Sequence, residues 1–305
     1  MTYRVSLPCT QAEAETLAGD IPQFASLEAP PVLVTHAAGR DGWRLDAYFE
    51  AKPGRGDLDL LKSLVPSAAA AVPAVAAVGE EDWVSLSQQG LEPIRAGRFF
   101  VHGPADRGAA PPGAIAFEID AGRAFGTGRH ETTAGCLIAL DRLKRQGASF
   151  DAIADVGTGT GLLAFAALRL WPAARAIASD VDPVAIEVAK ANAAINRVRL
   201  GRARGQLEFV VAAGLDHARL KARAPYDLII ANILAGPLID LAPSLSAALV
   251  PGGWLMLAGL LDRQAEAVAA AYRREGMMVV DSRAHGEWPT LVLRKRRRLR
   301  SAGRR

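Results

Sequence analysis

The stretch A-D-V-G-T-G-T-G-L runs from Ala154 to Leu162, and S-D-V-D-P follows at Ser179 to Pro183. The apolar residues Ala152 to Val156 predict a short buried strand, the glycines predict a tight turn, and Leu162 to Leu170 predicts a packed helix. Asp180 falls about 20 residues further on, where a second parallel strand would end and a carboxylate can accept hydrogen bonds from ribose hydroxyls. A tight turn without a ligand would explain the glycines but not this acid. The pattern therefore indicates a nucleotide-type cofactor site.

The spacing of the glycines bears on which cofactor binds. They form G-x-G-x-G, whereas the dinucleotide fingerprint is G-x-G-x-x-G, and Leu162 stands where its last glycine would be. Asp155 precedes the loop, where a carboxylate would repel an anionic pyrophosphate but attract a cationic sulfonium that carries an amino group. We therefore expect S-adenosylmethionine as the cofactor and keep an NAD-dependent enzyme as the alternative.

Composition places the chain among globular proteins. Half of its 305 residues are hydrophobic, which allows a sizeable core and excludes wholesale disorder. Cys9 and Cys136 are too few and too far apart for a disulfide framework or a zinc site, so we expect two reduced packing residues. The N-terminus lacks the pattern of a targeting peptide, and the apolar run at 68–78 is too short for a membrane span. We expect a cytoplasmic monomer.

The formal net charge of +4 describes mainly one end of the chain. Eight basic side chains lie between Arg294 and Arg305, and without them the rest of the chain has a net charge of −4. The basic balance therefore does not indicate a nucleic-acid-binding face across the fold. We expect residues 294–305 to form a solvated, disordered tail, with a weak contact to RNA as the alternative.

Two different patterns divide the chain. Residues 1–78 predict a small α+β domain, with a helix at Thr10 to Leu17, a hairpin from Val32 to Phe49 and a helix at Asp57 to Leu64. Residues 79–92 read as a linker. Residues 93–293 would form the larger domain, beginning with a strand at Arg95 to His102.

Strands and helices alternate along the larger domain, which predicts an α/β fold with a mostly parallel, seven-stranded sheet. The expected strands are Ala152–Val156, Ala174–Ser179, Leu207–Val211, Tyr226–Ile230, Trp254–Ala258, Met277–Val280 and Leu291–Leu293. The expected helices include Ala134–Leu143, Leu162–Leu170, Pro183–Ile195, Leu238–Leu249 and Asp262–Arg274.

A second glycine-rich segment, A-F-G-T-G-R-H-E-T-T, spans Ala124 to Thr133. Thr132 or Thr133 could simply cap the helix that follows. The density of polar residues also suits a lid that closes over a cofactor and contacts it through hydroxyl groups. His130 and Glu131 are adjacent and offer no metal-ligand spacing, so we expect no metal.

A third segment, Y-D-L-I-I-A-N-I-L-A-G-P-L, starts at Tyr226 and carries Asn232 at the end of an apolar strand. Parallel sheets bind ligands at the carboxyl ends of their strands, close to the glycine loop. The amide of Asn232 can accept a hydrogen bond from a substrate amine and so direct the nitrogen lone pair at a methyl group. A turn-forming role at the strand end is the alternative.

Taken together, F-G-T-G-R-H-E-T-T, D-V-G-T-G-T-G-L-L-A and A-N-I-L-A-G-P-L resemble the PrmA family of ribosomal-protein methyltransferases. P-G-G-W-L-M-L-A-G-L-L from Pro251 and G-E-W at Gly286 to Trp288 support the resemblance, which is close from about Asp82 to Leu293. Only the general layout agrees in the first 78 residues. The resemblance implies a Rossmann-like S-adenosylmethionine-dependent methyltransferase domain with an N-terminal substrate-recognition domain.

The resemblance also implies roles for individual residues. The family trimethylates protein eleven of the large ribosomal subunit, on lysine side-chain and N-terminal amines. Its cofactor-binding positions fall on Thr133, Gly157, Asp180 and Asn232, and Asn232 also lies beside the acceptor amine as the catalytic residue. Phe125 and His130 match the loop that closes over the cofactor. Gly159 completes the cofactor-binding set through its place in the glycine turn.

Other functions keep the same cofactor site. A lysine methyltransferase of another protein, such as an electron-transfer flavoprotein, would carry the same motifs. An RNA N-methyltransferase fits less well, because enzymes that methylate base amines commonly place proline–proline–aromatic after the Asn, whereas this chain has Ile233, Leu234 and Ala235. A non-catalytic binding module would predict a damaged glycine loop, and this loop is intact.

Overall fold

The structure is a computed structural model that describes residues 2–17, 31–38, 42–49, 51–78, 93–120 and 130–297. It divides into two compact units, Met1–Gln89 and Gly90–Arg305. The expected linker at 79–92 lies outside the described residues.

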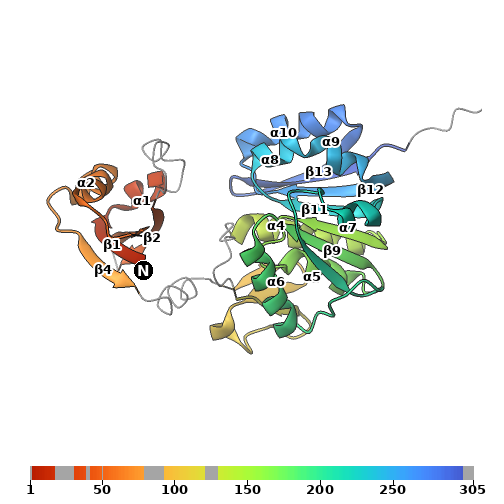
Figure 1. The fold of residues 1–305 in the computed structure, drawn as a ribbon, viewed down its shortest axis with the longest axis horizontal. Coiled ribbons are helices and arrows are strands. Elements are labelled where there is room, and N and C mark those ends of the chain that lie inside the picture. Colours follow the sequence, from red (N-terminus) through yellow and green to blue (C-terminus); the bar gives the residue numbers. More distant parts are fainter. Residues whose placement is uncertain are drawn as a thin grey trace, which may run out of the picture. The chain divides into compact units, whose positions relative to one another are not determined.

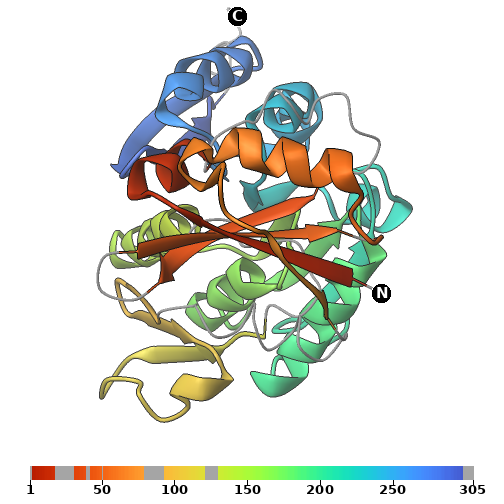
Figure 2. The ribbon, with the colours of Figure 1, turned by 90° about the vertical axis from the view of Figure 1, so that its left-hand side faces the viewer.

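The first unit is a four-stranded antiparallel sheet in the order β2-β3-β1-β4. Helices α1 and α2 cover one face of it, and apolar side chains of both helices share a core with the inner side chains of the strands (Figures 1 and 2). The expected pairing of two strands in a hairpin is confirmed, whereas β1 and β4 were not expected from the sequence. The elements are β1 (Thr2–Cys9), α1 (Gln11–Leu17), β2 (Val32–Ala38), β3 (Gly42–Phe49), α2 (Arg55–Leu64) and β4 (Ala74–Val78).

The second unit is built on a seven-stranded sheet in the order β10-β9-β8-β11-β12-β14-β13. Neighbouring strands from β10 to β12 are parallel, and β14 runs antiparallel to both β12 and β13. The predicted α/β fold with a mostly parallel sheet is therefore confirmed. The strands are β8 (Ala152–Val156), β9 (Arg175–Asp180), β10 (Leu207–Val211), β11 (Tyr226–Asn232), β12 (Leu249–Ala258), β13 (Met277–His285) and β14 (Trp288–Lys295).

Helices cover both faces of this sheet (Figure 1). One core forms where α4, α5 and α6 pack on one face, and a second core forms under α7, α8, α9 and α10 on the other. This layering follows from the almost entirely buried central strands, whose side chains need a helical cover on each side. The helices are α4 (His130–Arg145), α5 (Leu162–Leu170), α6 (Pro183–Ile195), α7 (Ala218–Arg223), α8 (Ala235–Asp240), α9 (Ala242–Ala247) and α10 (Asp262–Arg274).

A small sheet precedes this fold. The expected single strand at Arg95 to His102 is a hairpin of β5 (Ile94–Ala96) and β6 (Phe99–His102), because Gly97 turns the chain with φ of 59°. Strand β7 (Ile115–Glu118) lies parallel to β6. Apolar side chains of all three strands join the core under α4 and α5.

Two other boundaries differ from the sequence-based ones. The predicted helix Leu238–Leu249 is divided into α8 and α9, because Pro243 has no N–H to continue the first helix. Strand β14 continues through Lys295, two residues into the segment expected to be a tail. The Arg294 guanidinium lies 4.9 Å from the Trp254 ring centre, and Lys295 Nζ donates to the carbonyl of Leu249 at 2.8 Å, so both side chains belong to the packed unit.

Candidate active site

The motif residues meet at one edge of the seven-stranded sheet. The glycine loop follows β8, Asp180 ends β9 and Asn232 ends β11, and β8 lies between the other two strands. Since all three strands are parallel, their carboxyl ends lie side by side. The chain crosses over between β8 and β11, so this edge is the topological switch point where such sheets bind ligands.

The glycine loop is fixed against its neighbours by backbone contacts. Gly157, Gly159 and Gly161 have φ of 71°, 53° and 86°, a region that other residues adopt only with strain. The N–H groups of Gly157 and Thr158 donate to the carbonyl of Ser179 at 2.8 and 2.9 Å. A Cβ on Gly157 would lie 2.1 Å from the Ile233 Cγ2. The residue after Asn232 therefore packs directly on the loop, which brings the two predicted motifs together.

Asp180 holds this loop through one of its carboxylate oxygens. Its Oδ2 accepts a hydrogen bond from the N–H of Gly159 at 2.9 Å, and its Oδ1 accepts one from the N–H of Asp182 at 3.1 Å. The side chain is half-buried, and each oxygen has a second lone pair. Asp180 can therefore bind ribose hydroxyls as expected while it also shapes the loop, a second role that the sequence did not indicate.

Asp155 is buried beneath the loop, with 1% of its surface exposed. Its Oδ2 accepts hydrogen bonds from Thr158 Oγ1 at 2.7 Å and from the N–H of Ala164 at 3.2 Å. Among the described residues its Oδ1 has no partner. Burial raises the pKa of Asp155 to about 7, against the lowering effect of these two hydrogen bonds, and nearby Asp180 raises it further.

An unpartnered buried carboxylate oxygen is costly unless a ligand or water satisfies it. A cation beside Asp155 Oδ1 would remove that cost, and S-adenosylmethionine carries both an ammonium and a sulfonium group. The carboxylate oxygens of Asp155 and Asp180 at this edge therefore suit that cofactor.

Asn232 is connected to the first turn of α4. Its Nδ2 donates to Thr132 Oγ1 at 3.4 Å, so its amide nitrogen is directed at the helix. Thr132 is 2% exposed, whereas Thr133, the predicted cofactor contact, is partly exposed one position further along. His130 begins α4, and Phe125 lies outside the described residues. The structure thus places Thr132 against Asn232, a contact that the sequence did not indicate.

Asn192 on α6 was not predicted as a site residue. It is fully buried and its amide nitrogen donates to the carbonyls of Asp120 at 2.9 Å and Thr160 at 3.2 Å. Its Oδ1 accepts a hydrogen bond from the N–H of Asp120 at 2.9 Å. Asn192 therefore ties the glycine loop to the chain just before residues 121–129, while Thr132 ties the chain just after them to Asn232.

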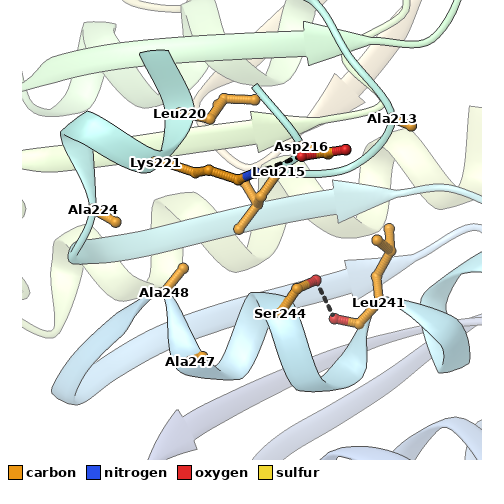
Figure 3. A pocket seen from close by; sticks show the side chains of 10 residues that line it. All are labelled: Ala213, Leu215, Asp216, Leu220, Lys221, Ala224, Leu241, Ser244, Ala247 and Ala248. Atoms are coloured by element: carbon orange, nitrogen blue, oxygen red, sulfur yellow. Dashed lines mark hydrogen bonds and ion pairs between the residues drawn. The ribbon is translucent and has the colours of Figure 1, made fainter. Parts of the chain in front are cut away.

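A cavity of about 450 Å³ lies elsewhere in the second unit, between α7 and α9 (Figure 3). Apolar side chains such as Leu220 and Leu241 line it, and Lys221 pairs with Asp216 at 2.5 Å on its wall. It shares no residue with the glycine loop, Asp180 or Asn232, so we assign no part of the chemistry to it.

The part of the chain that the structure describes contains no cluster of side chains that could hold a metal. Cys9 and Cys136 are buried free thiols, as expected. Among the described residues, no helix has the length and apolar character needed to cross a bilayer.

Comparison with known proteins decides the family. The profile of the family described as "Ribosomal protein L11 methyltransferase (PrmA)" matches residues 11–296. The chain belongs to this family. A ribosomal protein L11 methyltransferase of Caulobacter sp. is 41% identical over 93% of this chain and 95% of its own. One from Brucella suis is 49% identical over 64% of this chain and 66% of its own.

A solved structure agrees with this assignment. The ribosomal protein L11 methylase of Lactobacillus delbrueckii is 26% identical, has a TM-score of 0.55, and aligns over 67% of this chain and 98% of its own. The predicted resemblance to PrmA, the Rossmann-like methyltransferase fold and S-adenosylmethionine as the cofactor are thereby confirmed. The chain is a methyltransferase of this family.

Proposed function

We propose that this PrmA-family enzyme transfers methyl groups to lysine side-chain and N-terminal amines of ribosomal protein L11. The observation that carries the proposal is the place of Asn232, at the end of β11 and next to the residue that packs on the glycine loop. An uncharged amide at this point can accept a hydrogen bond from an amine without stabilising its protonated form, which a carboxylate would do.

The proposed cofactor contacts divide by charge. Asp155 would face a cationic group and Asp180 the ribose hydroxyls, while Gly157 and Gly159 let the backbone approach the ligand. Thr133, Phe125 and His130 would complete the site from the segment that precedes and opens α4, as the family resemblance implies. Bound S-adenosylmethionine supplies an activated methyl group on its sulfonium sulfur.

Asn232 and its neighbours would position the acceptor. The hydrogen bond from Asn232 Nδ2 to Thr132 leaves the carbonyl oxygen Oδ1 as the acceptor for an N–H of the neutral amine. The amine lone pair then points away from that N–H and toward the methyl group. Alignment of this kind accounts for a large part of the rate enhancement in reactions of preformed donors. We propose no general base, so the amine would lose its proton to water before it is held.

The residues after Asn232 favour an aliphatic amine over a base. Ile233 packs on Gly157, and Leu234 is 72% exposed, so the chain has no aromatic ring here on which a flipped base could stack. We therefore place a protein amine ahead of an RNA base as the acceptor.

The proposal is tested by mass spectrometry of L11 after incubation with the enzyme and S-adenosylmethionine. We expect added methyl groups on lysines and on the N-terminal amine, and their loss with Asn232→Ala. Methylation confined to other residue types would contradict the amine assignment. An electron-transfer flavoprotein, offered in parallel at the same concentration, should be methylated far more slowly than L11.

We further propose that the first unit presents L11 to the active site. A chain that starts at Gly90 keeps every described residue of the second unit, so it should bind S-adenosylmethionine with unchanged affinity. Turnover on L11 should fall steeply, because presentation supplies the positioning that makes transfer effectively intramolecular. A normal rate on L11 would show that the first unit has another role. The monomeric state and the cytoplasmic location stay predictions.

A further inference from the structure

The amino ends of the parallel strands form the edge of the seven-stranded sheet that lies opposite the active site. A cavity of about 370 Å³ lies at this edge. It lies where β8, β9, β10 and β11 begin, and α7 forms one wall of it. Guanidinium groups dominate the lining, with five arginines against two acids. The charged lining residues are Arg175, Arg202, Arg204, Arg219, Arg223, Glu208 and Asp151.

The acids of this basic cavity leave most of the positive charge uncompensated. Glu208 alone pairs with three arginines, namely Arg202 at 3.0 Å, Arg219 at 3.4 Å and Arg223 at 2.9 Å. One carboxylate can neutralise only one of these charges. Asp151 pairs with Arg204 at 2.5 Å. Among the described residues, Arg175 has no ion-pair partner, so the cavity has a surplus of three positive charges.

The arginines are held in place but remain accessible. Arg223 also donates to the carbonyls of Ala176 at 3.2 Å and Arg202 at 3.5 Å, and its side chain is only 16% exposed. By contrast, the side chains of Arg202 and Arg204 are 62% and 57% exposed. Each guanidinium has five donors, of which a single carboxylate uses one or two. The remaining donors suit the oxygens of a phosphate group.

Further basic side chains lie along the same edge of the sheet. The segment 197–204 has four arginines and no acid, although the chain without its basic end is net negative. Strand β14 is antiparallel to β12, so it ends where β12 begins, at this edge. Arg294, Lys295, Arg296 and Arg297 therefore lie about 19 Å from the start of β9, four strand spacings away. A row of this length suits an extended polyanion better than a single small anion.

We propose that this basic edge binds the phosphate backbone of RNA while the opposite edge methylates the protein substrate. The choice of RNA over an acidic protein rests on the proposed function, because a ribosomal protein acts in contact with RNA. Binding of the backbone needs no reading of the sequence, since arginine–phosphate contacts position a protein without specifying bases. The active site stays open during this contact, because the two edges lie at opposite ends of the strands.

The test measures binding of a short fluorescein-labelled RNA hairpin by anisotropy, between about 50 and 200 mM salt. The test variant is the full chain with Arg202→Gln and Arg204→Gln. The matched control, Arg263→Gln with Arg283→Gln, removes the same charge from exposed positions near the opposite edge. A third chain that ends at Arg297 separates the basic edge from residues 298–305. Melting curves check that each variant folds. We expect near-wild-type melting temperatures, because exposed ion pairs contribute little to stability.

We expect the test variant to bind RNA about 10- to 100-fold more weakly and to lower the slope of log Kd against log salt by about 2, one unit per lost phosphate contact. The control pair should leave the slope unchanged. Equal RNA affinity in the test variant and the wild type would overturn the proposal, and so would complete loss of binding on removal of 298–305. Displacement of the RNA by an equal charge of polyglutamate would identify an acidic protein as the partner instead. Methylation of free L11 is measured separately and should be unchanged in the test variant, so failure of RNA binding does not bear on the proposed function.

Discussion

Replacement of Asp155 by Asn tests whether its unpartnered oxygen faces the cationic part of the cofactor. The amide has nearly the shape of the carboxylate but no charge. Its NH2 group must face either the donors Thr158 Oγ1 and Ala164 N–H or the cofactor cation, and both arrangements are unfavourable. A charge-assisted hydrogen bond lost in this way costs about 1.5–3 kcal/mol. We therefore expect Asp155→Asn to bind S-adenosylmethionine roughly 10- to 100-fold more weakly at pH 7.5.

The pH dependence gives a sharper signature. The pKa of Asp155 is about 7 because burial disfavours its charge. A bound cation favours that charge and so lowers the pKa of the complex. Between the two pKa values, binding takes a proton off Asp155, and affinity should rise about tenfold per pH unit. Where the pKa of the complex lies below 5, wild-type Kd should therefore fall about 50-fold from pH 5 to pH 7 and level off above pH 7, whereas Asp155→Asn should show no such fall.

Calorimetry from pH 5 to pH 7.5 measures this, and the range stops below the pKa of about 7.7–8.0 typical of an α-amino group. Asp240→Asn is the control, since Asp240 is exposed and outside the site. S-adenosylhomocysteine keeps the ammonium but lacks the sulfonium, so it identifies which cation Asp155 meets. A wild-type Kd that is flat between pH 5 and pH 7 would refute the reasoning.

Four further predictions concern single residues. Asn232→Ala should lower turnover, and the wild-type rate should climb with pH toward the lysine pKa of about 10.4. Asn232→Asp should shift this climb to higher pH, because its charge stabilises the ammonium form of the substrate. A bell-shaped rate profile near neutrality that Asn232 substitutions leave unchanged would favour a base such as His130. Gly157→Ala should lower the free energy of unfolding by about 2–5 kcal/mol in a denaturant titration, because of strain at φ of 71° and the clash with Ile233. The control Gly147→Ala, at φ of 81° with open space around it, should lower the free energy of unfolding by only about 1–2 kcal/mol. Asn192→Ala removes both hydrogen bonds between Asn192 and Asp120 and should raise the Kd for S-adenosylmethionine severalfold at unchanged far-UV dichroism. Desolvation raises the pKa of Glu13, but hydrogen bonds from Ser67 and Thr10 outweigh it and lower the pKa to about 2. The stability that ionised Glu13 confers is therefore full above pH 4.5 and is lost as the pH falls toward 2. Over this window the unfolding midpoint of the wild type should drop more than that of Glu13→Gln.

The sequence predicted the parts of the fold that depend on local pattern. Long apolar runs separated by helical segments require a parallel sheet covered on both faces, and the strands from Ala152 to Ala258 follow this rule. The first unit was harder, because β1 and β4 acquire their strand character from pairing with distant strands, β1 with β3 and β4, and β4 with β1. The run A-V-A-A-V of β4 has no alternation, and only its pairing with β1 makes it a strand.

The features of the site that the sequence did not predict depend on contacts between residues far apart in the chain. A choice between Thr132 and Thr133 needs the rotation of α4 about its axis, which packing against β14 and β12 decides and the local sequence does not. The pKa of Asp155 depends in the same way on burial under α5. The sequence placed an acid before the loop but could not show that one of its oxygens would lack a partner.

Asn192 shows how the two halves of the active site depend on each other. The glycine loop, Asp155 and Asp180 lie at the carboxyl edge of the sheet, and the described chain on either side of residues 121–129 is tied to that edge by two side-chain contacts, at Asn192 and at Thr132 with Asn232. Each contact joins residues at least 72 positions apart in the sequence. Both are made by neutral amides, which can be satisfied without a countercharge in a site that must also hold a cation. Substitution at either amide should therefore weaken cofactor binding and acceptor positioning together, while loss of Asp155 should affect the cofactor alone.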